Sequence, residues 1–292
     1  MLFKGSGVAI VTPFDENNQV DYAAYKELLE FQIENGTDAI IAIGTTGEAS
    51  TMTEEERLET VRFAVETVAG RIPVIAGTGT NNTAASVAFS QKVEKLGVDG
   101  LLVVTPYYNK TSKRGLYEHF KAIANAVKTP IILYTVPGRT GVHIPVDTLV
   151  ELAKIENIVG LKDATGNLSY TVEVSRRVPE GFAIYSGNDD VVIPLMSVGG
   201  VGVISVLANC APKQSHDMCA AFLAGDVQRA MELQLQLKPL IDALFVETNP
   251  IPVKAAVNML GYRAGTVRLP LYEAEDGTKE KLRAELSALG IL

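Results

Sequence analysis

The sequence predicts an α/β fold, a (β/α)8 TIM barrel followed by a C-terminal helical appendage. Two observations predict it. Eight short apolar runs rich in Val and Ile recur along the chain, each followed by a polar turn and a helical pattern, and this strand pattern stops after about residue 225. Continuous apolar runs are typical of strands that helices cover on both faces, as in a parallel sheet. Eight βα units favour closure into a barrel over an open doubly wound sheet.

Helix signals stand between the predicted strands. Thr53 and Glu56 form a capping box that opens one helix, and Pro145 begins another at a first-turn position. Gly97 and Gly225 stand where C-terminal helix caps are expected. The first strand is not followed by a GxGxxG motif, which weakens a dinucleotide-binding alternative. The eight apolar runs are residues 8–13, 39–44, 73–78, 101–106, 131–137, 158–164, 183–188 and 201–208.

The rest of the chain has a helical pattern only. We predict Asn249 as the N-cap of the second helix there, because its amide can accept from a first-turn N–H. We divide the chain into a catalytic barrel domain, residues 1–225, and a C-terminal helical domain, residues 226–292. The three predicted helices of the second domain are residues 227–245, 250–260 and 278–289.

The composition excludes several classes of protein. With 34 Asp and Glu against 26 Lys and Arg, the chain is acidic, which disfavours a nucleic-acid-binding surface. Two cysteines are too few for a disulfide scaffold, and three scattered histidines form no metal-ligand cluster.

Residues 191–212 are uncharged and approach the length of a membrane span, but Pro194 and several glycines interrupt them, so we predict a short helix, a turn and a buried strand. Because the chain does not begin with a basic segment followed by an apolar one, we expect it in the cytoplasm.

Lys162 is the clearest candidate for a reacting group, because none of the other seven strands contains a Lys or Arg. In such a barrel the reacting groups lie at the C-terminal ends of the strands. Burial disfavours an ammonium, so this lysine is expected to have a lowered pKa and to act as an amine nucleophile. The alternative is a structural lysine paired with Asp163 or Glu48. Lys254 is a competing lysine, but it lies in a predicted helix away from the strand ends and is expected to be structural.

Three further features follow other strands. Tyr134 near the end of the fifth strand is placed to exchange protons with an intermediate at the lysine, although a strand tyrosine also serves simple packing. Thr45 and Thr46 lie between glycines in a turn whose N–H groups can approach a carboxylate. Arg139 follows the fifth strand and suits a substrate carboxylate, the alternative being a solvated loop arginine.

With these residues assembled, the whole chain resembles the pyruvate-dependent class I aldolase and lyase family of (β/α)8 barrels. Within it, the chain is similar to the members that condense pyruvate with L-aspartate 4-semialdehyde. Five motifs in the family's order carry the resemblance: Gly44-Thr45-Thr46-Gly47-Glu48, Tyr107-Tyr108-Asn109, Val136-Pro137-Gly138-Arg139-Thr140-Gly141, Gly160-Leu161-Lys162-Asp163 and Ser186-Gly187-Asn188-Asp189.

The resemblance implies a reaction. Lys162 would form a Schiff base with pyruvate, and its enamine would attack the aldehyde of L-aspartate 4-semialdehyde. Cyclisation would give 4-hydroxy-tetrahydrodipicolinate, for lysine and diaminopimelate biosynthesis. The iminium is itself the electron sink, so we expect no cofactor and no metal.

The resemblance also implies roles for individual residues. Tyr134, Thr46 and Tyr108 match the family's proton-relay triad, and Tyr108 would reach into the active site of the neighbouring subunit. Thr45 and Thr46 would hold the carboxylate of pyruvate, and Arg139 that of the semialdehyde. The remaining matches, which line the site through backbone carbonyls, are Gly187 and Ile204. The implied assembly is a homotetramer, a dimer of tight dimers.

Two other functions share features with this one. N-acetylneuraminate lyase and the 2-keto-3-deoxy sugar acid aldolases also use a Schiff-base lysine, but Arg139 and the Thr45-Thr46 pair favour the semialdehyde. A non-catalytic metabolite-binding barrel would have lost Lys162 or Tyr134, and both are present. Lysine-inhibited members carry a serine, histidines and a glutamate at a dimer-interface effector site, so we predict weak or absent feedback inhibition. The corresponding residues here are Ala49, Glu54, Arg57 and Ala85, with only Asn81 and Tyr107 matching.

Overall fold

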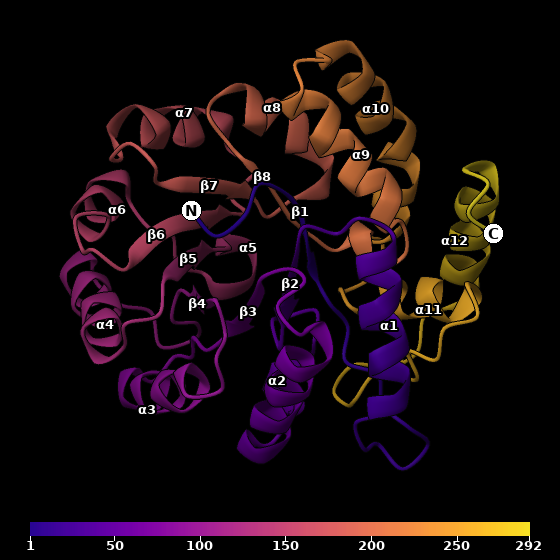
Figure 1. Ribbon diagram of the computed structural model, residues 1–292, viewed down its shortest axis with the longest axis horizontal. Coiled ribbons are helices and arrows are strands. Elements are labelled where there is room, and N and C mark those ends of the chain that lie inside the picture. The colour runs from indigo at the N-terminus through magenta and orange to yellow at the C-terminus, as the bar shows by residue number, and fades with distance from the viewer.

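Eight parallel strands close into a barrel in chain order, β1 to β8, in the computed structural model, which describes residues 1–292 (Figure 1). This confirms the predicted fold, and each predicted run overlaps one strand. The first strand starts three residues earlier than predicted, because Gly5 pairs with Gly202 and closes the barrel. The strands are β1 (Gly5–Ala9), β2 (Ala39–Ala42), β3 (Val74–Gly77), β4 (Gly100–Val104), β5 (Ile131–Thr135), β6 (Ile158–Asp163), β7 (Ala183–Ser186) and β8 (Gly202–Ser205).

Helices between the strands form a ring around the barrel (Figure 1). The capping box is confirmed: Thr53 Oγ1 accepts from the Glu56 N–H at 3.2 Å, and the Glu56 carboxylate accepts from the Thr53 N–H at 2.8 Å. Pro145 is the N-cap of its helix and not a first-turn residue, so that prediction was one position off. The helices are α1 (Tyr22–Glu34), η1 (Ala49–Thr51), α2 (Glu54–Val68), α3 (Thr83–Glu94), α4 (Lys113–Ala126), α5 (Pro137–Thr140), α6 (Val146–Leu152), α7 (Leu168–Arg177), η2 (Asp189–Val191), α8 (Val192–Ser197), η3 (Leu207–Asn209) and α9 (Pro212–Leu223).

The barrel interior is packed at its N-terminal end. Phe3 and Tyr185 stack there with ring centroids 4.4 Å apart, and the Tyr185 hydroxyl donates to the Phe3 carbonyl at 2.8 Å. Ile41, Ile75 and other interior side chains form a separate cluster of 12 buried residues with them. A larger cluster of 62 residues fills the layer between strands and helices. Since the closed end is filled, the open end for chemistry is the one where the strands finish.

The C-terminal region consists of three helices, α10 (Val227–Ala243), α11 (Ile251–Met259) and α12 (Asp276–Ala288), packed on one side of the barrel (Figure 1). Gln234 of α10 joins it to the barrel, accepting from the Ile193 N–H and donating to the Asp189 carbonyl. One hydrophobic cluster contains residues from both regions, and the division at residue 225 stays a prediction.

Two local predictions have different outcomes. Residues 191–212 form a short helix, a turn and a buried strand as predicted, and no helix of the structure is both long and apolar enough to cross a membrane. Asn249 is not the N-cap of α11, so that prediction was wrong. Pro250 takes the cap position, because the Asn249 amide instead donates to the Thr46 hydroxyl inside the barrel mouth.

Candidate active site

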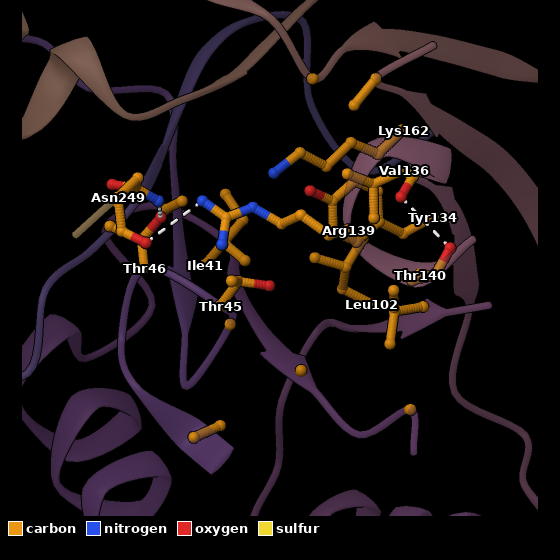
Figure 2. Close-up of a pocket in the computed structure, with 18 of the residues that line it drawn as sticks. Ile41, Thr45, Thr46, Leu102, Tyr134, Val136, Arg139, Thr140, Lys162 and Asn249 are labelled. Carbon is orange, nitrogen blue, oxygen red and sulfur yellow. Dashed lines mark hydrogen bonds between the residues drawn. The ribbon is translucent and has the colours of Figure 1, made fainter. Parts of the chain in front are cut away.

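A cavity of about 310 Å³ opens at the C-terminal mouth of the barrel. Six of the eight predicted site residues line it, from the ends of β2, β5, β6 and β7 and the loops that follow (Figure 2). This is the end of a (β/α)8 barrel where reacting groups gather. The six are Thr45, Thr46, Tyr134, Arg139, Lys162 and Gly187.

Lys162 lies on β6, in register with Tyr134 on β5 and Tyr185 on β7, so all three side chains point into the barrel. Its amine lies 4.4 Å from the centroid of the Tyr134 ring, and only 6% of the residue is exposed. Burial lowers the pKa of Lys162 to about 8, and nearby Arg139 acts in the same direction, whereas Asp189 opposes both. A large fraction of neutral amine is therefore present near pH 8.

The structural alternative for Lys162 was wrong, because neither proposed carboxylate pairs with it. Asp163 accepts from Thr165 and Thr171, and Glu48 accepts from Lys254 at 2.8 Å. Burial lowers the pKa of Lys254 to about 8 as well, so pKa does not separate the two lysines. Their geometry does. The Lys254 amine is occupied by a carboxylate and a carbonyl, whereas Lys162 has no carboxylate oxygen within 4.0 Å and lines the cavity.

Asp189 sets the electrostatic surroundings of Lys162. This fully buried carboxylate accepts from the Ser205 hydroxyl at 2.6 Å and from two N–H groups after β8, those of Val206 and Leu207, at 3.0 Å each. Burial raises the pKa of Asp189, and these three donors and Lys162 oppose that rise. Sequence reasoning included Asp189 in a motif but assigned it no role, because the donors come from a different strand.

Tyr134 and Thr46 are both buried in the cavity wall. Burial raises the pKa of Tyr134 to about 12, so its hydroxyl stays protonated at neutral pH. Thr46 Oγ1 accepts from Asn249 Nδ2 at 2.9 Å, and no hydrogen bond joins it to Tyr134. Thr45 is exposed on the same turn.

Arg139 extends across the cavity from α5, with its guanidinium between Asn249 and Lys162 (Figure 2). One guanidinium nitrogen donates to the Asn249 carbonyl at 3.1 Å. The other N–H groups are free to bind a carboxylate with two hydrogen bonds. Asn249 is a site residue that sequence reasoning missed, since it was assigned to a helix cap.

The other three predicted residues differ in placement. Gly187 lines the cavity through its backbone, and a Cβ there would lie 2.7 Å from that of Ala164, so no other residue fits without movement. Ile204 is fully buried inside the barrel and does not line the cavity. Tyr108 is 92% exposed and lies outside the cavity of its own chain, whereas Tyr107 lines it.

Comparisons with known proteins show the family to which the chain belongs. The model of the dihydrodipicolinate synthetase family matches residues 2–289. The 4-hydroxy-tetrahydrodipicolinate synthase of Alkaliphilus oremlandii is 54% identical over 291 residues, 100% of both chains. The dihydrodipicolinate synthase structure from Thermotoga maritima superposes with a TM-score of 0.98 at 44% identity, covering 100% of both chains. A monomeric dihydrodipicolinate synthase variant matches at a TM-score of 0.98 and 44% identity, over 100% of this chain and 98% of that one. The chain belongs to the dihydrodipicolinate synthetase family.

Proposed function

We propose that this chain condenses pyruvate with L-aspartate 4-semialdehyde, through a Schiff base on Lys162, to give 4-hydroxy-tetrahydrodipicolinate in lysine and diaminopimelate biosynthesis. The enzyme is a lyase of the class I aldolase type. The observation that carries the assignment of Lys162 is a buried amine, facing the cavity with a pKa of about 8 and no carboxylate partner.

The first step forms the electron sink. The neutral amine of Lys162 adds to the keto carbon of pyruvate, and loss of water leaves an iminium. Removal of a methyl proton then gives an enamine, whose carbon attacks the aldehyde carbon of the semialdehyde, and the aldehyde oxygen takes up a proton. The amino group of the semialdehyde finally attacks the iminium carbon, which closes the ring and releases Lys162. This sequence requires no cofactor and no metal.

The substrate carboxylates are assigned to two places in the cavity wall. Thr45 and Thr46, with the N–H groups of their turn, hold the carboxylate of pyruvate beside Lys162. Arg139 holds the carboxylate of the semialdehyde. The N–H groups of Arg139 that are not used in its bond to the Asn249 carbonyl support this assignment. Gly187 contributes a backbone carbonyl to the cavity wall, and Ile204, which lies outside this wall, has no contact assigned.

Proton transfer is assigned to Tyr134, Thr46 and a tyrosine of a neighbouring subunit. The raised pKa of Tyr134 keeps the phenol as a proton donor toward the intermediate on Lys162. Tyr108 projects into solvent with 92% of its surface exposed, which supports a role in another chain's cavity. We therefore propose a homotetramer built from two tight dimers, working in the cytoplasm.

Pyruvate consumption by the purified protein tests the function. Aspartate semialdehyde and N-acetylmannosamine are offered in parallel, and rapid loss of pyruvate is expected with the semialdehyde alone. Loss with the sugar alone would leave the Schiff-base chemistry intact and overturn the substrate assignment. Borohydride reduction in the presence of pyruvate, followed by peptide mapping, tests the nucleophile, and a stable adduct on Lys254 in place of Lys162 would refute it.

A further inference from the structure

We propose that a buried ion pair between Glu48 and Lys254 holds the Thr45-Thr46 turn in position for the carboxylate of pyruvate, which makes both charged residues positioning residues. The proposal rests on the proposed function, because it concerns the affinity of that site for pyruvate. The turn belongs to the barrel, and Lys254 belongs to α11 of the C-terminal region.

The Glu48–Lys254 pair is buried, and both groups have further hydrogen-bond partners. Lys254 Nζ lies 2.8 Å from Glu48 Oε1, and the two side chains are 2% and 1% exposed. The same amine donates to the Thr266 carbonyl at 2.6 Å and lies 4.3 Å from the centroid of the Phe14 ring. The second oxygen of Glu48 accepts from the Arg268 N–H at 2.9 Å. The carboxylate is therefore fixed from two sides by residues of the C-terminal region.

The backbone of the turn is bent so that the Glu48 side chain points away from the cavity that Thr45 and Thr46 line. Glu48 has φ +56° and ψ 33°, in the left-handed region that a non-glycine residue adopts at a cost. Its N–H donates to the Thr45 carbonyl at 3.1 Å, which closes the turn. Thr45 and Thr46 line the cavity, whereas the side chain of Glu48 does not. The interactions of the Glu48 side chain offset that cost and keep the threonines at the cavity wall.

A second link joins the same turn to the same region. Asn249 lies five residues before Lys254 in the chain, and its amide donates to Thr46 Oγ1 at 2.9 Å (Figure 2). Since this hydroxyl oxygen accepts from Asn249, its own hydrogen is free to be donated into the cavity. The barrel supplies one anchor of its own, a hydrogen bond from Thr12 to the Gly47 carbonyl at 2.7 Å. The turn is thus held between its own barrel and the C-terminal helices.

A stabilising role alone would not need charges. A buried ion pair is often no more stabilising than apolar residues of similar volume, whereas removal of one partner leaves an unpaired buried charge. The double variant Glu48→Leu/Lys254→Met therefore keeps the packing while it removes the hydrogen bonds that direct the turn. Protein stability and pyruvate affinity are expected to respond differently to it.

The experiment measures borohydride trapping of pyruvate on Lys162 by mass spectrometry, as a function of pyruvate concentration, together with the thermal melting of each protein. In the double variant we expect a half-saturating pyruvate concentration at least tenfold above wild type, with a melting temperature within a few degrees. The matched control is His216→Gln, which breaks the 3.0 Å contact of His216 with Asp38 at the N-terminal end of the barrel, and it should leave the half-saturating concentration unchanged.

Each variant has an outcome that would overturn the proposal. A folded double variant with half-saturation within twofold of wild type overturns the proposal, as does an equal rise in the His216→Gln control. If circular dichroism shows the double variant unfolded, Glu48→Gln is judged in its place. That variant keeps the shape of the side chain and its contact with Lys254 but turns an amide toward the Arg268 N–H, and less than a threefold rise then overturns the proposal. Failure of the wild-type enzyme to be trapped at Lys162 would instead refute the proposed function.

Discussion

Schiff-base formation is expected to depend on pH with a midpoint near the pKa of Lys162. Burial, with a smaller contribution from Arg139, lowers this pKa from 10.5 to about 8. Only the neutral amine attacks a carbonyl. At pH 7 about a tenth of Lys162 is neutral, compared with about three in ten thousand for a lysine at its ordinary pKa, so burial raises the reactive fraction roughly 300-fold.

The assay is the initial rate of adduct formation at Lys162 with saturating pyruvate, quenched with borohydride at short times between pH 6 and pH 10. The rate should rise about tenfold from pH 6 to pH 7 and level off above about pH 9, because the neutral amine then predominates. In Arg139→Met the midpoint should move upward, since the guanidinium disfavours a second positive charge nearby.

Two results would refute this reasoning. A wild-type rate that still rises steeply at pH 10 would mean that Lys162 keeps the ordinary pKa of an exposed lysine. A midpoint that stays in place or moves down in Arg139→Met would mean that Arg139 does not act on the amine through its charge. As a control, exposed Lys213, paired only with Asp217 on the surface, should form far less pyruvate adduct than Lys162 at pH 7.

Three further predictions concern other parts of the site. Arg139→Met should raise the KM for the semialdehyde about tenfold to a hundredfold, which is the range expected for loss of a charge-assisted hydrogen bond. The KM for pyruvate should stay within threefold of wild type. Steady-state kinetics with each substrate varied checks this, and equal effects on both substrates would contradict it. L-lysine should inhibit weakly or not at all. At the effector site Ala85 supplies no carboxylate for the amine of lysine, and the Arg57 guanidinium, 4.3 Å from the Phe89 ring, adds a positive charge. Titration of the activity with L-lysine checks this, and clear inhibition at sub-millimolar lysine would contradict it. Tyr108→Phe should lower kcat at least tenfold and leave trapping of pyruvate intact, as a lost proton donor does, and activity should partly return in mixtures with the inactive variant Lys162→Ala if Tyr108 serves a neighbouring subunit.

The strands and the nucleophile could be predicted from the sequence because their signals are local. A continuous apolar run is typical of a strand covered on both faces, and a single lysine in such a run stands out wherever the chain closes. Tyr134, Arg139 and the Thr45-Thr46 turn follow strand ends, and all strand ends of a parallel barrel meet at one mouth. The structure confirmed that these residues share a cavity.

The tertiary structure alone decided how distant segments pair. Asn249 has the side chain of a helix cap and precedes a helix, yet its amide donates to Thr46, which lies 203 residues away in the sequence. Lys254 and Glu48, 206 residues apart, pair with each other, whereas Lys162 has no carboxylate oxygen within 4.0 Å. Asp189, in η2, likewise accepts a hydrogen bond from Ser205 on β8. Hydrophobic periodicity and helix caps act over a few residues, so the sequence alone determines the strands and helices. The partners of buried polar groups depend on barrel closure and on the docking of the C-terminal helices, because these bring the groups within hydrogen-bonding distance.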